Sequence, residues 1–140
     1  MKKWFGLVLI ILLLSLLISC SGVNGLTPSH EAEKFVGFWV NEDKVTPEIT
    51  KIDITRAGND ILVHMWGKCT PDDCDWGITK TAVSDAEDGI LNLTWDHGFS
   101  VITQELFLLS DVRLKVNSFY YFREELPKDY GTTEYFVKKS

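Results

Sequence analysis

The chain has 140 residues, 45% of them hydrophobic, and carries a formal net charge of −6 at pH 7. That length leaves room for one compact domain rather than two once a leader is removed. The acidic balance argues against nucleic acid as a partner, because neutralising phosphates needs clustered Lys and Arg. It also provides no basic surface to attract anionic lipids.

The amino-terminal segment has the pattern of an export signal. Lys2 and Lys3 precede an apolar stretch over residues 7–14, which is shorter than the ~20 residues of a membrane-spanning helix. The sequence therefore predicts a signal peptide over residues 1–19 and a domain that folds outside the cytoplasm.

Leu17-Ile18-Ser19-Cys20 stands where that signal ends. This tetrapeptide resembles the lipobox of bacterial lipoproteins, in which the cysteine is acylated on its sulfur and on its new amino terminus. The resemblance implies that Cys20 anchors the chain to the lipid bilayer of the cell membrane or an outer membrane, on its extracytoplasmic side. A second acyl chain makes attachment durable where one chain is marginal. An ordinary signal peptide and an uncleaved anchor are the alternatives.

The segment after Cys20 is polar, with Ser, Gly, Asn, Thr and Pro and no apolar period. It predicts a flexible tether over residues 20–33, followed by one domain over residues 34–140.

Strand-like segments separated by turn residues fill that domain. They span residues 35–41, 49–56, 61–66, 76–83, 90–95, 101–109, 112–116, 119–124 and 132–138. No long stretch shows the 3.6-residue period of a helix. We therefore expect an all-β domain of about eight antiparallel strands with short connections, forming a small up-and-down barrel or, alternatively, a β-sandwich.

Gly37-Phe38-Trp39 lies on the first expected strand. It resembles the G-x-W element of lipocalins and other calycins, where the tryptophan closes one barrel end and an arginine from the last strands stacks on it. The resemblance implies a calycin-like barrel with Trp39 and Arg123 as the packing pair at its end. Such stacking would contribute ~0.5–2 kcal/mol.

Two cysteines remain once the anchor is assigned. Cys69 and Cys74 form an even pair in an oxidising compartment, so a disulfide is expected. Zinc is rejected because their spacing is not that of paired zinc knuckles. Residues 66–77 also resemble a W-G-x-C-x-P-x-D-C-D-W-G signature of small bacterial secreted proteins, which implies no particular activity.

The same loop concentrates acidic and aromatic side chains: Trp66, Asp72, Asp73, Asp75 and Trp76. One interpretation is a stapled turn in which the aspartates cap backbone amides. A second is a glycan or partner contact, with flat tryptophan faces beside carboxylate acceptors. A third, calcium, is poorly supported because the spacing fits no EF-hand, and we expect neither metal nor cofactor.

Polar residues on otherwise apolar strand faces mark a possible cavity. Gln104 shares a face with Ile102 and Leu106, and His64 lies between Val63 and Met65. If both side chains point inward, His64 and Gln104 could hold the headgroup of a small hydrophobic ligand. The alternative is that each is a satisfied or rim-exposed polar residue.

The sequence contains none of the common catalytic motifs that were sought: it has no G-x-S-x-G elbow, H-E-x-x-H helix or P-loop. Alternation places Phe119 and Tyr121 together on one face, where an envelope protein could bind. The sequence thus predicts a non-enzymatic lipoprotein that binds a ligand or an envelope partner. The alternatives are a carbohydrate-binding module and a small hydrolase.

Overall fold

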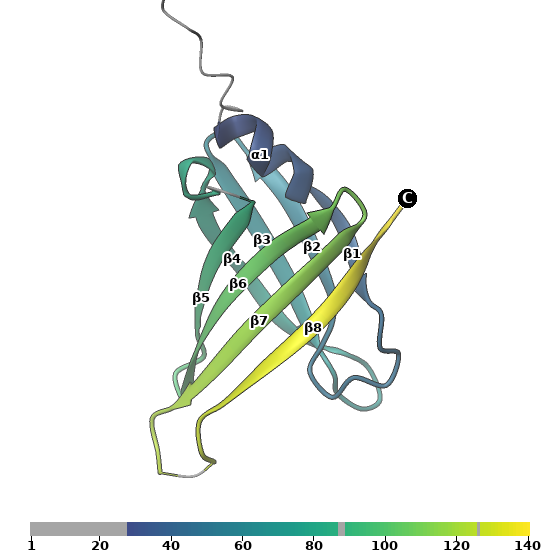
Figure 1. Cartoon of the computed structure of the whole chain (residues 1–140). Helices are drawn as coiled ribbons and strands as arrows, with labels where there is room; N and C mark the ends of the chain where they lie inside the picture. Colours follow the sequence, from purple (N-terminus) through teal and green to yellow (C-terminus); the bar gives the residue numbers. More distant parts are fainter. Residues whose placement is uncertain (1–27, 87–88, 126) are drawn as a thin grey trace, which may run out of the picture.

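The computed structural model describes residues 28–86, 89–125 and 127–140, which form one short α-helix, eight strands and a 3-10 turn (Figure 1). The elements, in chain order, are α1 (Pro28–Phe35), β1 (Gly37–Asn41), β2 (Ile49–Ala57), β3 (Asp60–Gly67), β4 (Cys74–Ala82), η2 (Val83–Asp85), β5 (Ile90–Asp96), β6 (Ser100–Ser110), β7 (Arg113–Phe122) and β8 (Tyr130–Lys139).

The strands form a single antiparallel sheet in the order β4-β3-β2-β1-β8-β7-β6-β5. Because β1 pairs with both β2 and β8, the sheet curls until its two edges, β4 and β5, face each other (Figure 1). No backbone ladder joins these edges, but the Thr79 hydroxyl donates to the Thr94 carbonyl at 3.1 Å. The result is a nearly closed up-and-down barrel, the architecture of lipocalins and other calycins. The expected barrel is confirmed, and a two-sheet sandwich is excluded.

One expected strand break is wrong. Residues 112–116 and 119–124 were expected to form separate strands, yet β7 runs through both and pairs with β6 and β8 along its length. Its inward side chains include Val116, Ser118 and Tyr120, whereas Phe119 and Tyr121 point outward. Alternation predicts that these two aromatics share a face, and the structure shows that it is the outer one.

Helix α1 is a correction to the predicted tether, since residues 28–33 are helical rather than extended. Ala32 and Phe35 lie three residues apart, share one face and are fully buried against the barrel. Glu31 and Lys34 form an ion pair on the exposed side at 2.9 Å. Sequence inspection missed the helix because eight residues contain only one apolar repeat. Among the described residues, no helix is long and apolar enough to cross a bilayer. The signal peptide, Cys20 and the first part of the tether lie outside the described residues.

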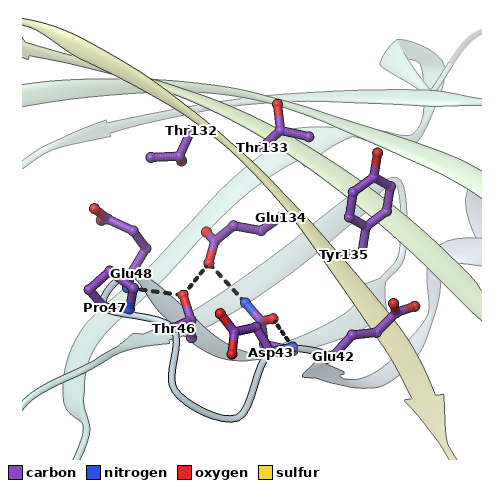
Figure 2. Close-up of a pocket in the computed structure, with 10 residues that line it drawn as sticks. Glu42, Asp43, Thr46, Pro47, Glu48, Thr132, Thr133, Glu134 and Tyr135 are labelled. Atoms are coloured by element: carbon purple, nitrogen blue, oxygen red, sulfur yellow. Dashed lines mark hydrogen bonds between the residues drawn. The ribbon is translucent and has the colours of Figure 1, made fainter.

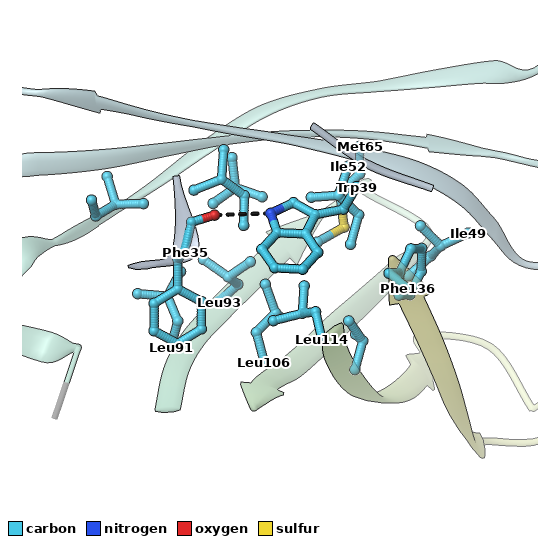
Figure 3. Close-up of a cluster of buried hydrophobic side chains, with 14 of the residues drawn as sticks. Phe35, Trp39, Ile49, Ile52, Met65, Leu91, Leu93, Leu106, Leu114 and Phe136 are labelled. Carbon is cyan, nitrogen blue, oxygen red and sulfur yellow. Dashed lines mark hydrogen bonds between the residues drawn. The ribbon is translucent and has the colours of Figure 1, made fainter. Parts of the chain in front are cut away.

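The half of the barrel beneath α1 is filled with apolar side chains (Figure 3). Trp39 is fully buried there and donates from its indole Nε1 to the Phe35 carbonyl at 2.8 Å, which ties β1 to the helix. The core around it includes Phe35, Ile52, Met65, Leu91, Leu106, Leu114 and Phe136. Apolar side chains thus form the interior of this end of the barrel.

The predicted Trp39–Arg123 pair is wrong. The cation over the Trp39 ring is Lys138 of β8, whose Nζ lies 4.8 Å from the ring centroid and donates to the Lys34 carbonyl at 3.0 Å. Arg123 follows β7 at the opposite end of the barrel and pairs with Asp96 at 2.7 Å. A cation from the last strand does cap the tryptophan, but a lysine provides it because β8, and not the end of β7, lies next to β1.

Candidate functional site

The barrel interior changes character along its axis. Beneath α1 it is apolar, whereas toward the other end the buried side chains become polar: Asn41, Thr46, Ser100, Gln104, Ser118 and Glu134. Buried polar groups lower stability unless they are hydrogen-bonded. Their concentration at the end without a helix therefore distinguishes this open end as the candidate site.

Gln104 lies in the layer between the two halves. Its Oε1 accepts from the Trp95 indole at 2.7 Å, and its Nε2 donates to the Ser118 hydroxyl at 3.0 Å. Gln104 does point inward, as the ligand-anchor hypothesis requires, but its hydrogen bonds are already made to neighbouring strands. It forms the polar floor of the open end rather than a free anchor for a headgroup.

His64 does not join Gln104, so the hypothesis that the two hold a headgroup together is wrong, and the alternative of a hydrogen-bonded polar residue outside the cavity describes His64. On β3 the buried residues are Val63 and Met65, and His64 alternates with them on the outer face. Its Nε2 lies 2.6 Å from Asp75 Oδ1, and its ring stacks on Trp66 at 3.8 Å between centroids. Trp66 therefore also faces outward, beneath Lys51 Nζ at 5.1 Å.

The cysteine loop is confirmed as disulfide-linked, with Cys69 and Cys74 bonded and their Cα atoms 5.4 Å apart. Asp73 ties the loop to β2, since it accepts from the Thr50 hydroxyl at 2.8 Å and lies 3.5 Å from Lys51 Nζ. The Thr50 hydrogen bond and the nearby lysines hold the pKa of the Asp73 carboxyl below its usual value. Asp72 is exposed. Within the described residues no group of three His, Cys, Asp or Glu side chains is placed to bind a metal.

Trp76 is the one member of the predicted loop set that reaches the interior. The β3–β4 register shifts between Met65 and Trp66, which pair with Gly77 and Asp75 and leave Trp76 as the extra residue of a β-bulge. Gly77 adopts a φ of 84°, and its amide donates to Asp75 Oδ1 at 2.7 Å. A bulge re-aims a side chain, and here it turns the indole into the open end.

Gly67 makes that orientation possible. A Cβ atom at residue 67 would lie 2.4 Å from Trp76 Nε1, closer than any side chain allows. The indole therefore lies against bare backbone, where its ring contacts Trp95 at 6.0 Å and Tyr120 at 6.5 Å, both near perpendicular. The two W-G dipeptides of the sequence signature thus have distinct roles: one glycine admits the indole and the other forms the bulge.

A pocket of about 380 Å³ opens beside Trp76, with walls that are largely aromatic. Tyr120 of β7 and Tyr130 of β8 stack at 4.5 Å between centroids, with an angle of 11° between their planes. The remaining lining residues are Asp75, His97, Phe99, Ser100, Ile102 and Phe122. This volume suits a small molecule, since ligand pockets span roughly 300–1,000 Å³.

Three polar atoms at this end are buried without a hydrogen-bond partner among the described residues: Tyr120 Oη, Thr132 Oγ1 and His97 Nε2. Tyr120 is 5% exposed, so water at the surface does not solvate its hydroxyl. Burial raises the pKa of Tyr120 above its usual value, and so do the charge of the nearby Glu48 carboxylate and its attraction for the phenol proton, although no hydrogen bond of ordinary geometry joins the two groups. Leaving such a group unsatisfied costs ~1–3 kcal/mol.

A second hollow, of about 440 Å³, adjoins the connection between β1 and β2 and is centred on Glu134 (Figure 2). Glu134 Oε1 accepts from Asn41 Nδ2 and from the Thr46 hydroxyl, each at 2.8 Å. Burial raises the pKa of the Glu134 carboxyl, although hydrogen bonds from Thr46, the Ile49 amide and Asn41 act in the opposite direction. Glu134 thus fastens the connection to β8 and brings a carboxylate to the barrel mouth.

The sequence did not identify Tyr120, Tyr130, Thr132, Glu134 or His97 as site residues. Glu134 had a usable signal, because alternation on the last strand places Thr132, Glu134 and Phe136 on one face and a carboxylate between them is unusual. Tyr120 had none, since the four successive aromatics of β7 look alike until the register is known.

Comparisons with known proteins identify no family. No family model matches the chain, and no curated protein matches it. Among solved structures, a crystal structure of a mutant of the fluorescent protein UnaG matches with a TM-score of 0.36 and 13% identity, over 77% of this chain and 98% of that one. A likeness at this level assigns neither ligand nor activity.

Proposed function

We propose that this protein is an extracytoplasmic, lipid-anchored barrel that binds a small, partly apolar molecule in the aromatic pocket at its open end. The observation that carries the proposal is the buried, unpartnered Tyr120 hydroxyl beside the pocket of about 380 Å³. A ligand that enters between Trp76 and Tyr130 would bury apolar area against their rings and supply the hydrogen bonds that Tyr120 and His97 lack.

The asymmetry of the interior supports the proposal. A barrel that only had to be stable would fill both ends, since unfilled space and unpaired polar groups each lower stability. Here the end under α1 is packed with apolar side chains, whereas the aromatic pocket and the hollow around Glu134 lie at the other end. Pockets with apolar walls and a few convergent polar groups are typical ligand sites.

The proposed location rests on the sequence alone. Lys2, Lys3 and the lipobox ending in Cys20 support export and acylation, and the Cys69–Cys74 disulfide agrees with an oxidising compartment. Labelling cells with a palmitate analogue tests it: we expect incorporation into the wild-type chain and none into Cys20→Ser. Equal labelling of both chains would remove the anchor from the proposal.

We propose binding rather than catalysis. No hydroxyl or thiol of the described residues is hydrogen-bonded to the imidazole of His64 or His97, so neither ring is placed to activate a side-chain nucleophile. A binder needs only the arrangement of rings and acceptors described above. A hydrolase would also need a nucleophile or an activated water, which no contact in the described part of the chain supplies.

Fluorescence titration of the full chain tests the site with a panel of neutral dyes, fatty acids, aromatic alcohols, amines and short glycans. At least one compound is expected to bind saturably and to alter tryptophan emission, since Trp76 lines the pocket. Tyr120→Phe should weaken its binding by about tenfold, equivalent to ~1.4 kcal/mol for a lost hydrogen bond. Tyr121→Phe is the matched control, because that neighbouring tyrosine points outward. Equal effects of the two variants, or no saturable binding by any compound, would refute the pocket assignment.

A second candidate function is recognition of an envelope protein through the outer face of β7. Phe119 and Tyr121 are 40% and 46% exposed and their rings lie 4.5 Å apart. Exposed, adjacent aromatics are enriched in interfaces. Crosslinking in cells from a photoreactive residue at position 121 would support this function if it captures one discrete partner that a probe at position 105, on the outer face of β6, does not.

A further inference from the structure

The charges around the open end narrow the chemistry of the ligand. Residues lining the aromatic pocket include one carboxylate, Asp75, and those lining the adjacent hollow include Glu42, Asp43, Glu48 and Glu134. Neither lining contains a Lys or Arg. Of the basic side chains near the mouth, Arg113 pairs with Glu42, Arg123 with Asp96 and Lys51 with Asp73, while Lys44 donates to the Asn41 carbonyl beside the adjacent hollow. An anionic ligand in the aromatic pocket would therefore meet the Asp75 carboxylate without a cation among the lining residues.

The carboxylates at the open end favour a ligand rich in hydrogen-bond donors. When ionised, Asp75, Glu48 and Glu134 can only accept hydrogen bonds, whereas the unpartnered Tyr120 and Thr132 hydroxyls can both donate and accept. An ammonium group brings up to three N–H donors and no acceptor. It therefore complements these carboxylates, which would repel a carboxylate or phosphate ligand.

Glu48 connects the acidic and aromatic parts of the open end. The Tyr130 hydroxyl lies 3.3 Å from Glu48 Oε1, and Tyr130 stacks directly on Tyr120. Trp76 stands nearly perpendicular to Tyr120, at 88°. Two rings at right angles beside a carboxylate present electron-rich faces to one volume, the arrangement by which proteins hold organic cations.

We propose that the ligand of the open end is a small organic cation, a protonated or quaternary amine whose apolar part lies against Trp76, Tyr120 and Tyr130. This inference rests on the proposed binding function and specifies its ligand class. Desolvated cation–ring contacts contribute ~2 kcal/mol or more, and the carboxylates add attraction that a neutral molecule of the same shape does not receive.

Three probes with one skeleton test it: 2-phenylethylammonium, 2-phenylethanol and phenylacetate, carrying charges of about +1, 0 and −1 at pH 7. Calorimetric titration of the full chain should give the tightest binding for the ammonium, about tenfold weaker binding for the alcohol, and the weakest for phenylacetate. Glu48→Gln should weaken binding of the ammonium more than binding of the alcohol, and so reduce that preference. Glu105→Gln, an exposed carboxylate on the outer face of β6, is the matched control and should change neither.

The outcomes separate this inference from the proposed function. If the alcohol or phenylacetate binds as tightly as the ammonium, the cation assignment is wrong and the binding function stands. The same conclusion follows if none of the three binds while another compound of the wider panel does. If no compound binds at all, the open end holds only water, and both proposals fail.

Discussion

The two ends of the barrel solve the same packing problem differently. Under α1, Trp39 uses its polar atom internally by donating to Phe35, and apolar side chains fill the remaining space. At the open end Trp76 also points inward, yet it leaves a pocket and stands beside the unpartnered Tyr120 hydroxyl. One end is therefore built for stability, and the other leaves hydrogen-bonding capacity unused. This difference supports the open end of the barrel as the proposed ligand site.

The largest expected effect is at the closed end. Phe35→Ala removes a fully buried ring that joins α1 to the barrel, so we expect the free energy of unfolding to fall by ~3–5 kcal/mol. The matched variant Phe99→Ala removes an exposed ring at the open end and should cost less than ~0.5 kcal/mol. Urea denaturation followed by circular dichroism measures both. Comparable losses would contradict the division between a packed end and an open one.

Gly67→Ala should disrupt the packing of the open end and leave the packed end under α1 unchanged. A Cβ atom 2.4 Å from Trp76 Nε1 forces the indole to move, with a loss of stability of ~1–3 kcal/mol from overpacking. Tryptophan emission should shift, and ligand binding should weaken more than it does in Gly58→Ala. Gly58 lies in the hairpin between β2 and β3, and a Cβ atom added there would meet no other atom within 4 Å. Gly58→Ala therefore reports the effect on the backbone without a steric clash. Unaltered emission in Gly67→Ala would show that Trp76 does not depend on this close approach.

Tyr120→Phe should affect stability and binding in opposite directions. Because the hydroxyl is buried and unpartnered, its removal should leave the ligand-free chain equally stable or up to ~1 kcal/mol more stable. A structural hydroxyl would instead give a loss of similar size. Thermal unfolding of the wild-type chain and of Tyr120→Phe, with Tyr121→Phe alongside, distinguishes the two cases.

The smallest effect concerns Glu134. Its pKa is raised above the usual 4.5 by burial, so the folded state holds the proton more tightly than the unfolded state. The stability contributed by this group is present at lower pH and is lost as the pH rises from about 4.5 through the raised pKa. Glu134→Gln should remove that part of the pH dependence, whereas Glu124→Gln, at an exposed position, should not. Parallel pH profiles for wild type and Glu134→Gln would contradict the assigned shift.

Much of the fold could be predicted from the periodicity and the turn residues of the sequence. Alternation predicts most of the strands and which residues share a face, such as Phe119 with Tyr121 and Gln104 with Ile102, because each depends only on neighbours along the chain. It does not predict which face of the Tyr121 strand points outward. Helix α1 was not predicted because its burial comes from contact with distant strands. The cation over Trp39 was misassigned for the same reason: the pairing of β1 with β8 selects Lys138, and no local pattern reveals that pairing.

The site was less visible than the fold. The tryptophans of the cysteine loop were expected to act together, but one bulge sends Trp76 inside and leaves Trp66 outside. The hypothesis that His64 points inward is wrong, and the sequence could not decide it, because a polar residue between two apolar ones fits either face of a strand. Tyr120, Tyr130 and Glu48 converge only after three separate strand pairings are formed. Sequence patterns locate strands, whereas a pocket is a property of the register between them.

A high-resolution structure of the chain purified from its own cells under non-denaturing conditions tests the central claim most directly. We expect non-protein density between the Trp76 and Tyr130 rings, with an atom within hydrogen-bond distance of the Tyr120 hydroxyl. A pocket filled by rearranged aromatic side chains, or a Tyr120 hydroxyl that bonds only to Glu48 or to water, would contradict it.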